Sequence, residues 1–305
     1  MELTPTEKSA IGAFRSGDRD KPRPAPDHAL NEWLDFALNT TLEACRVIRR
    51  LRMTPLQDST SFKQDATPVT AQEEQIEQMI RERLTEFCPD AELVGEEMGG
   101  FLPEQGIAVA VDPLDGTWAL INRMSTTAVV LAFFRNGSPF LGIIANPATG
   151  EISYTMGTRK SRLLHLDMFG EQDIGVDLPL DQTPTDQPLV LVHSSRGSGP
   201  LVASLIDAWT LDQVRLVRME SGSPSLALAD AAKGNFIYVN LWERRPADPF
   251  DFVAAVQVIR NAGGEVVDGT GRPIDAQHHS GLLIAGINHA LIAQVAEIAN
   301  HCVSG

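Results

Sequence analysis

The chain has 305 residues, of which 43% are hydrophobic and 21% charged, as in a soluble globular protein with one large domain or two packed ones. Its formal net charge of -15 argues against a nucleic-acid polymer as partner, because a phosphate backbone requires a basic surface. No apolar run approaches the roughly 20 residues of a membrane span. The N-terminus has no apolar core of signal-peptide length. We therefore expect a cytoplasmic protein without a membrane partner.

The first half of the chain begins with helical patterns. Residues 1–26 are polar and contain four prolines, which predicts a flexible N-terminal tail. Apolar residues then recur at helical spacing from about residue 27 to Leu51, and again from Ile76 to Phe87. We interpret the acids of the second helix as a solvated face. Between the two helices, "KQDATPVT" (63–70) interrupts the pattern.

From about residue 106 the pattern changes to strands. The runs "IAVAV", "TTAVVLAFF", "FLGIIANP" and "EISYTM" are joined by short turns such as Asn136-Gly137, which predicts an antiparallel meander. Beyond "PTDQP", strands alternate with helices around 200–208 and 224–233, and a last helix covers about 251–261. Such alternation is typical of an α/β fold. We expect an α+β half over 27–183 and an α/β half over 184–305.

The segment "VDPLDG" (111–116) places two acids at a strand's end, because proline cannot continue a central strand. Asp112 and Asp115 point at one small volume, where two bare carboxylates repel each other unless a cation lies between them. Oxygen ligands favour Mg²⁺, and the carbonyl of Leu114 is a further candidate ligand. Gly116 and Thr117 open a short helix whose N–H groups can bind a phosphate. A helix cap at Asp115 and a turn at Asp112 are the alternative interpretation.

Three other segments also place acids at the ends of elements. "VGEEMGG" (94–100) puts Glu96 after an apolar run, and "DPFDFVAAVQVIRNAGG" (248–264) puts Asp251 in the first turn of a helix. "TPVTAQEE" (67–74) puts Glu73 at another helix start. Taken singly, these are also typical of surface acids, a helix-dipole partner and a capping box.

Taken together, "GEE", "DPLDGT" and an aspartate at a helix start 11 residues before "AGG" resemble the inositol monophosphatase family. "SSR" (194–196) and "SGSPSLALADAAKG" (221–234) are similar to the family's second half, so that the resemblance runs from about residue 28 to the end. The superfamily includes bisphosphate nucleotidases, histidinol-phosphate phosphatases and fructose-bisphosphatases. It implies an α/β (α+β) sugar-phosphatase fold with layers in the order α-β-α-β-α.

The resemblance also implies Mg²⁺-dependent, often Li⁺-sensitive, hydrolysis of a small phosphate monoester. Two or three Mg²⁺ ions would be held by Glu96, Asp112, the Leu114 carbonyl, Asp115 and Asp251. Thr117, with Glu73 and Glu96, would act on the attacking water, and the N–H groups of Gly116 and Thr117 would bind the phosphate. The positions expected to contact the substrate are Ser223, Ser225, Asn240, Arg244 and Arg245. A homodimer is common in the family.

The sequence departs from the family in three places. Glu73 stands where the family usually has aspartate, and its extra methylene could move the carboxylate away from the water. Phe250-Asp251 replaces the family's "WD". The segment "NLWERRPADPFD" is longer and more basic than in relatives, so that Arg244 and Arg245 are candidates to bind a second phosphate or a carboxylate; a solvated surface pair is the alternative.

Several functions stay open. "KQDATPVT" favours the bisphosphate-nucleotidase or histidinol-phosphatase branches, whereas "GEE" and "NPATGE" favour inositol phosphatases. A haloacid-dehalogenase-type phosphatase would need one residue between the acids, not two, and no G-x-S-x-G elbow of a serine hydrolase is present. A non-catalytic relative with a binding or regulatory role has only Glu73 in its support. His193, at the end of a strand, is a further candidate to face the site.

Overall fold

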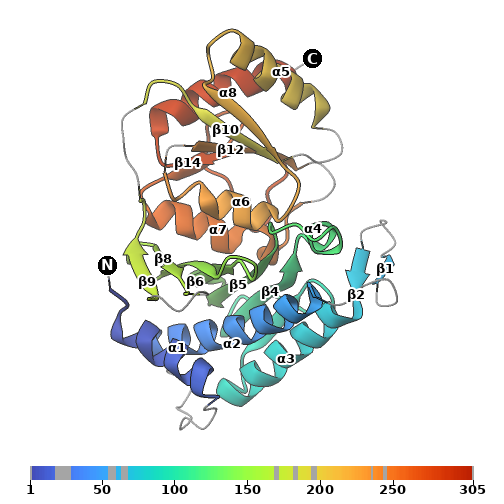
Figure 1. Ribbon diagram of the computed structural model, residues 1–305, viewed down its shortest axis with the longest axis vertical. Helices are drawn as coiled ribbons and strands as arrows, with labels where there is room; N and C mark the ends of the chain where they lie inside the picture. Colours follow the sequence, from blue (N-terminus) through green and yellow to red (C-terminus); the bar gives the residue numbers. More distant parts are fainter. Residues whose placement is uncertain are drawn as a thin grey trace.

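In the described part of the chain, two large β-sheets alternate with three groups of helices, and β1 and β2 pair in a separate two-stranded sheet (Figure 1). The computed structural model describes residues 2–17, 29–53, 60–62, 68–167, 172–180, 185–193, 198–234, 236–242 and 246–303. Its helices are α1 (Pro5–Ser16), α2 (Leu30–Leu51), α3 (Ala71–Phe87), α4 (Thr117–Ile121), α5 (Gly199–Thr210), α6 (Pro224–Asp230), α7 (Pro249–Asn261) and α8 (His289–Val303). Its strands are β1 (Thr60–Phe62), β2 (Pro68–Thr70), β3 (Glu92–Gly95), β4 (Ile107–Asp115), β5 (Ala128–Arg135), β6 (Ser138–Ala145), β7 (Glu151–Met156), β8 (Arg162–His165), β9 (Ile174–Asp177), β10 (Leu189–His193), β11 (Leu216–Glu220), β12 (Phe236–Trp242), β13 (Glu265–Asp268) and β14 (Gly281–Gly286).

The layers follow the order α-β-α-β-α. Helices α2 and α3 cover one face of the sheet that contains β3–β9, with α1 beside α2. Helices α6 and α7 contact the other face of this sheet and also strands of the second sheet. Helices α5 and α8 contact strands of the second sheet and each other. The layered α/β fold that the resemblance implied is confirmed.

The first sheet has seven strands in the order of the sequence, β3-β4-β5-β6-β7-β8-β9. Strand β3 runs parallel to β4, and every later pair is antiparallel. The β5–β6 turn has positive φ angles at Asn136 and Gly137, the conformation that the Asn-Gly pair favours. The predicted antiparallel meander is therefore confirmed, and β8 and β9 extend it.

Strand β5 shows why this part of the sequence reads as one continuous apolar run. Its side chains alternate between the two helical layers, and both sets are buried. Those packed with α2 and α3 are Val129, Leu131 and Phe133, and those packed with α6 and α7 are Ala128, Val130, Ala132 and Phe134. Because helices cover both faces of the sheet, no polar alternation is left in the sequence.

The sequence predicted that strand β4 ends at its first acid, but the strand continues beyond it. It pairs with β5 up to Asp112 and Val130, and after a shift of register it pairs again at Asp115 and Ala128. Pro113 lies within this irregularity, where the missing N–H costs no ladder hydrogen bond. The two acids therefore stand on either side of a bulge within the strand.

The second sheet has five strands in the order β11-β10-β12-β14-β13. Strand β10 runs parallel to both β11 and β12, as expected for an α/β unit, whereas β14 is antiparallel to β12 and β13. Helix α6 follows β11 and helix α7 follows β12, so the carboxyl ends of these two strands lead into the middle helical layer.

The N-terminal segment differs from the predicted flexible tail, because residues Pro5–Ser16 form helix α1 and pack on α2. Glu7 is 0% exposed and accepts hydrogen bonds from the Tyr154 hydroxyl at 2.7 Å and from Nε of Arg162 at 2.8 Å. The expectation is wrong for this helix, because partners far along the chain bury one of its polar residues, Glu7. Residues 18–28 lie outside the described part of the chain.

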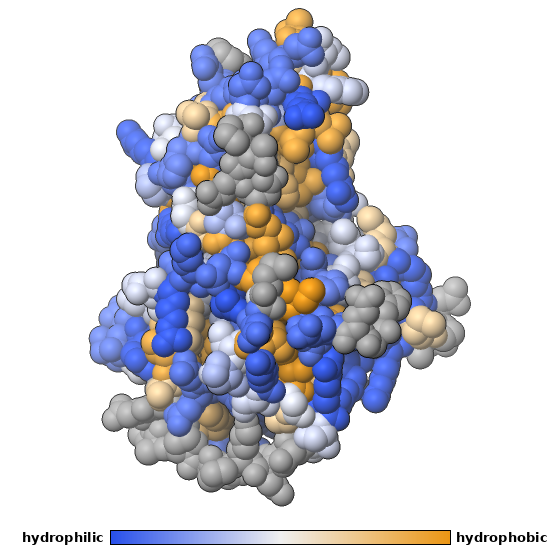
Figure 2. Space-filling model, turned by 60° about the vertical axis from the view of Figure 1, so that its left-hand side comes forward, coloured by the Kyte–Doolittle hydropathy of each residue, from blue (hydrophilic) through white to orange (hydrophobic). Residues whose placement is uncertain are grey.

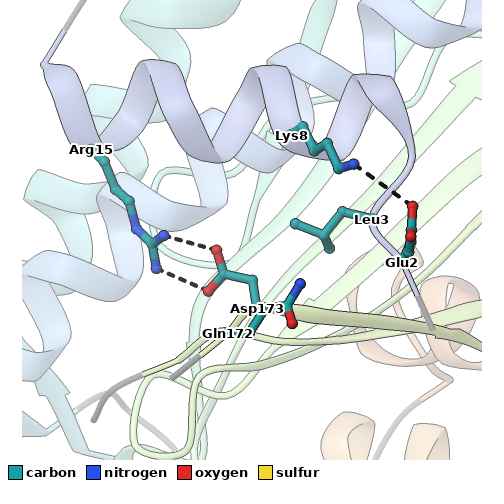
Figure 3. Close-up of a pocket in the computed structure, with 6 residues that line it drawn as sticks. All are labelled: Glu2, Leu3, Lys8, Arg15, Gln172 and Asp173. Atoms are coloured by element: carbon teal, nitrogen blue, oxygen red, sulfur yellow. Dashed lines mark hydrogen bonds and ion pairs between the residues drawn. The ribbon is translucent and has the colours of Figure 1, made fainter. Parts of the chain in front are cut away.

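A second ion pair fastens the other end of α1. Arg15 makes two contacts with the carboxylate of Asp173, at 2.8 and 2.9 Å, and both residues line a pocket of about 340 Å³ (Figure 3).

The face of the molecule in Figure 2 is mostly hydrophilic, with apolar side chains gathered along its middle. Among the described helices, none combines the length and the apolarity that crossing a membrane requires.

Candidate active site

The bulge near the end of β4 carries the two acids that the sequence singled out. The N–H of Leu114 donates a 2.9 Å hydrogen bond to Oδ1 of Asp112, so the first acid closes its own turn. Gly116 follows with a φ of 91°, a left-handed conformation that favours glycine. A Cβ atom there would lie 2.9 Å from the nitrogen of Ser223 and 3.0 Å from the carbonyl oxygen of Thr126. Gly116 is therefore needed both for its backbone angle and for a close approach.

Asp112 and Asp115 are buried acids, with 5% and 8% of their surface exposed. Burial raises the pKa of Asp112 well above its usual range, and the negative charges of Glu96 and Asp115 raise it further. Burial also raises the pKa of Asp115 to about 7, although hydrogen bonds from Ser223 and Ser225 act in the opposite direction. Three acidic groups thus act on one another at the turn, and a cation would relieve their repulsion.

Thr117, the first residue of α4, is joined to the start of α3. Its hydroxyl donates a 2.7 Å hydrogen bond to Oε1 of Glu73 and lies 3.4 Å from the carbonyl oxygen of Leu114. Glu73 is 2% exposed, so this carboxylate is held inside the protein. The extra methylene of Glu73, compared with aspartate, therefore does not prevent its contact with Thr117.

Helix α6 ties Asp115 to the second half of the chain. Ser223, the N-cap of α6, donates from its hydroxyl to Oδ2 of Asp115 at 2.6 Å and accepts from the N–H of Leu226 at 2.9 Å. The N–H of Ser225 donates to the same oxygen of Asp115 at 3.0 Å. The hydroxyl of Ser225 donates to the carbonyl oxygen of Asp251 at 2.6 Å. Ser223 and Ser225 were predicted to contact substrate, but each is 1% exposed and binds protein groups instead.

Asp251 lies in the first turn of α7, where the sequence placed it. Its Oδ2 accepts a 2.6 Å hydrogen bond from the N–H of Asp248, and the two residues form a reciprocal capping box. Asp248 is therefore the N-cap of α7, and Asp251 lies in the first turn of the helix, the position of a helix-dipole partner. Because the hydroxyl of Ser225 also binds the carbonyl of Asp251, this turn of α7 lies beside the start of α6 and hence beside Asp115.

Glu96 follows β3, and its N–H donates to the carbonyl oxygen of Val111 on β4 at 3.1 Å. The next two N–H groups, of Glu97 and Met98, donate to the carboxylate of Glu77 on α3 at 2.9 and 3.2 Å. The sequence interpretation of the α3 acids as a solvated face missed Glu77, which is 0% exposed. Its position four residues after Glu73 was the available signal, because that spacing places both side chains on one face of a helix.

Polar side chains also line the carboxyl ends of β10 and β12. Asn240 is 0% exposed, and within the described residues neither its side-chain oxygen nor its nitrogen has a hydrogen-bond partner. The Tyr238 hydroxyl and Nδ1 of His193 are buried in the same unpaired way. The strands pair up to Val192 and Val239, so that His193 and Asn240 directly follow the last pair. Burial lowers the pKa of His193 to about 4. Such groups are costly to bury unpaired, so this row is suited to a polar ligand.

Some predicted positions cannot be placed. Arg244, Arg245, the "SSR" segment (194–196) and residues 63–67 lie outside the described residues. The structure brings together Glu73, Glu96, Asp112, Leu114, Asp115, Gly116 and Thr117 around the β4 turn, with Asp251 reached through Ser225.

The donor set fits a hard divalent cation. In the described part of the chain, no three histidine, cysteine or acidic side chains already converge closely enough to enclose a metal ion. Asp112 and Asp115 are nevertheless buried beside each other and beside Glu96, and their mutual repulsion contributes to the raised pKa of Asp112. Carboxylate and carbonyl oxygens are the ligands that Mg²⁺ prefers. The residues able to hold the ion are Glu96, Asp112, the Leu114 carbonyl and Asp115, with Asp251 nearby.

Comparison with known proteins agrees with this site. Residues 29–301 match the model of the inositol monophosphatase family. The inositol-1-monophosphatase of Rhizobium meliloti is 30% identical over 241 residues, which cover 75% of this chain and 82% of that protein. The histidinol-phosphatase of Chlorobaculum parvum is 36% identical over a shorter stretch of 90 residues, 30% of this chain and 35% of that protein.

The fold agrees as well. The solved structure of the IMPase of Thermotoga maritima superposes with a TM-score of 0.73 at 21% sequence identity, covering 90% of this chain and 98% of that one. The family match extends over both sheets and includes every described acid of the site. The chain therefore belongs to the inositol monophosphatase family and is a phosphoric monoester hydrolase.

Proposed function

We propose that this protein hydrolyses a small phosphate monoester with the help of Mg²⁺, by in-line attack of water on phosphorus. The observation that carries the proposal is the buried pair Asp112 and Asp115 with Glu96 beside it, whose repulsion needs a cation. A net charge of -15 does not argue against a phosphorylated substrate if cations mediate the contact. The buried acids of the site support metal dependence.

Each acid near the turn has a proposed place. Glu96, Asp112, the Leu114 carbonyl, Asp115 and Asp251 would hold two or three Mg²⁺ ions. Bound Mg²⁺ would lower the pKa of a water molecule and neutralise charge on the attacking and leaving oxygens. The protein contributes position, because phosphoryl transfer needs little other chemistry from side chains. Ser223 and Ser225 support this geometry by fixing Oδ2 of Asp115, which leaves its other oxygen for an ion.

Thr117 and Glu73 are proposed to orient the attacking water. The Thr117 hydroxyl donates a 2.7 Å hydrogen bond to Glu73, so the lone pairs of the hydroxyl oxygen are directed to accept from another donor. Glu73 is proposed to hold that hydroxyl in place. When the water passes a proton to the Thr117 oxygen, Glu73 is proposed to accept the proton that Thr117 releases. The N–H groups of Gly116 and Thr117, at the start of α4, are proposed to bind the phosphate oxygens.

The alcohol part of the substrate is proposed to bind at the carboxyl ends of β10 and β12. Asn240, with both ends of its amide buried and unpaired, supports this placement, and Arg244 and Arg245 remain candidates for a second acidic group. An inositol monophosphate is the first candidate substrate, since the relative from Rhizobium meliloti aligns over most of both chains. Histidinol phosphate is the second, on the shorter match to a histidinol-phosphatase. A 3′(2′),5′-bisphosphate nucleotide is the third, on a match to a 3′(2′),5′-bisphosphate nucleotidase.

The non-catalytic alternative rested on Glu73. Because the Glu73 carboxylate reaches the Thr117 hydroxyl, its longer side chain gives no support to a loss of activity. A binding or regulatory relative would also have no need to keep three acids in repulsion at one turn. We therefore favour catalysis.

The test is phosphate release from inositol 1-phosphate, histidinol phosphate, 3′-phosphoadenosine 5′-phosphate and fructose 1,6-bisphosphate. Each substrate is assayed with Mg²⁺, with Mg²⁺ and Li⁺, and with a chelator in place of Mg²⁺. We expect release from one class, loss with the chelator and inhibition by Li⁺. Release that is undiminished by the chelator would contradict the metal assignment, and no release from any substrate by the folded protein would favour the non-catalytic alternative.

A further inference from the structure

We propose that Glu77 is a positioning residue of the active site, which holds the turn that carries Glu96 in its metal-binding place. This inference rests on the proposed Mg²⁺ dependence. Glu77 is 0% exposed on α3, and no part of its carboxylate meets water. A glutamate is seldom buried unless its charge is used by specific partners. Its partners show what the charge is used for.

The partners are the backbone N–H groups that directly follow Glu96. Oε2 of Glu77 accepts from the N–H of Glu97 at 2.9 Å, and Oε1 accepts from the N–H of Met98 at 3.2 Å. Two N–H groups in succession bound by one carboxylate fix both the position and the tilt of the peptide chain there. On the other side, the N–H of Glu96 itself donates to the carbonyl of Val111 at 3.1 Å. The backbone of the proposed ligand is thus held from β4 and from α3.

The turn is shaped around this carboxylate. A Cβ atom on Gly95 would lie 1.9 Å from Oε1 of Glu77, so only glycine leaves room for the carboxylate. Arg81, one turn further along α3, lies 3.2 Å from Oε1 of Glu77 and also reaches the carbonyl oxygens of Leu93 and Gly99, each at 3.4 Å. The charge of Glu77 is therefore balanced by a cation that holds the same loop.

Helix α3 joins two parts of the site through one face. Glu73 accepts from Thr117, and Glu77, four residues later, accepts from the turn after Glu96. Residues at this spacing lie one above the other along a helix. The helix therefore sets the distance between the proposed water-orienting hydroxyl and the proposed metal ligand Glu96. Loss of the Glu77 contacts is expected to free that ligand rather than to remove it.

The experiment compares Glu77→Gln with Glu82→Gln. Both variants remove one negative charge from α3, but Glu82 is exposed, and within the described residues its carboxylate accepts a hydrogen bond from Gln78 on the same helix. Binding of Mn²⁺, as a spectroscopic probe for Mg²⁺, is measured by electron paramagnetic resonance of the free ion without substrate. The Mg²⁺ concentration for half-maximal phosphate release is measured in parallel. We expect Glu77→Gln to weaken Mn²⁺ binding and raise that concentration about 10- to 100-fold, as for outer partners of metal ligands.

A positioning role also predicts rescue. Saturating Mg²⁺ should restore most of the turnover number of Glu77→Gln, because the ligand itself is still present. Glu82→Gln should behave as the unchanged protein in both measurements. The inference is overturned if Glu77→Gln melts at a lower temperature but binds Mn²⁺ with unchanged affinity, since Glu77 would then only stabilise the fold.

A second variant, Gly95→Ala, keeps Glu77 but pushes its carboxylate away, and it should weaken Mn²⁺ binding in the same direction. This variant decides the case if Glu77→Gln does not fold. Failure of the inference is distinct from failure of the proposed function. If only the inference fails, the unchanged protein binds Mn²⁺ and needs Mg²⁺, and the variants bind Mn²⁺ as tightly as it does. If the proposed function fails, the unchanged protein itself neither binds Mn²⁺ nor needs Mg²⁺.

Discussion

The hydroxyl of Thr117 lies 2.7 Å from a carboxylate oxygen of Glu73, and this hydrogen bond joins the start of α4 to the first turn of α3. The two residues are 44 positions apart in the sequence, and the carboxylate is buried. A buried carboxylate is costly for stability unless specific partners use its charge. We interpret the pair as one functional unit.

Replacement of Glu73 tests that unit. Glu73→Gln keeps an oxygen that can accept from Thr117 but removes the negative charge, so the turnover number should fall roughly 100-fold or more while KM changes little. Steady-state kinetics at saturating Mg²⁺ measures both. Glu73→Asp, which restores the family's usual residue, serves as the comparison and should retain far more activity than the amide. Equal turnover by the glutamine variant and the unchanged protein would show that the charge has no part in the reaction.

Replacement of Asp112 by asparagine should separate stability from activity. The pKa of Asp112 is raised by burial, by Glu96 and by Asp115, so without metal its charged form destabilises the fold. Asparagine removes that charge and can still accept from the N–H of Leu114. In a chelator, we expect Asp112→Asn to be more stable than the unchanged protein by about 1–3 kcal/mol, with no measurable phosphatase activity in Mg²⁺.

Urea unfolding with and without Mg²⁺ measures the effect. Mg²⁺ should stabilise the unchanged protein, by about 2.7 kcal/mol at 100 times its dissociation constant, and should have a much smaller effect on Asp112→Asn. If both proteins gained the same stability from Mg²⁺, Asp112 would not be a ligand.

The sequence predicted those parts of the site that depend on short-range chemistry. The interruption of β4 at Pro113 and the short helix opened by Gly116 and Thr117 both follow from residues within a few positions of one another. The antiparallel meander followed from turn residues such as Asn136-Gly137 in the same way. Only the continuation of β4 past Pro113 differed, because pairing with β5 resumes after the bulge.

Long-range contacts could not be predicted in this way. Glu7 and Arg162 are 155 residues apart, and nothing near Glu7 in the sequence marks it as buried. Glu77 lies among other helical acids, and the backbone N–H groups that it binds belong to a turn 20 residues later. Ser223 and Ser225 were recognised as site residues, but their direction toward Asp115 depends on how the two sheets meet.

The buried Glu7 should make the docking of α1 dependent on pH. Burial acts to raise the pKa of Glu7, but hydrogen bonds from Arg162, Tyr154 and Thr4 outweigh it and hold this pKa below its usual value. The folded state thus binds fewer protons than the unfolded state in acid. The resulting stability is present above the unfolded pKa, about 4.3, and is lost as the pH falls through the folded one.

Glu7→Ala should therefore cost roughly 3 kcal/mol at pH 7, because Arg162 loses its buried partner. Urea unfolding of both proteins at pH 7 and at successively lower pH should show the two stabilities converging in acid. KM for the substrate should be unchanged, since α1 packs beside α2 and lies away from α4, which follows the β4 turn (Figure 1). A difference in stability that is constant over the whole pH range would exclude the carboxylate as the cause.

Gly116 and Gly106 provide a matched pair for the close approach at the site. Their φ angles are 91° and 88°, so alanine at either position carries a similar backbone strain of about 1 kcal/mol. A Cβ on Gly106 meets nothing within 4 Å, whereas a Cβ on Gly116 meets the nitrogen of Ser223 at 2.9 Å. That atom is backbone and cannot turn away. Gly116→Ala must therefore move either α4 or the segment before α6.

Either movement disturbs the hydrogen bond between Ser223 and Asp115 or the position of Thr117. We expect Gly106→Ala to lose a little stability and keep its activity, and Gly116→Ala to lose activity by 100-fold or more, since misplacement by about 1 Å has such effects on catalysis. Thermal melts and phosphate release measure the two properties. Similar activity in the two variants would mean that the turn and α6 can separate without harm, and that their contact is structural. A selective loss in Gly116→Ala would show that catalysis requires the first sheet and α6 to meet at this glycine.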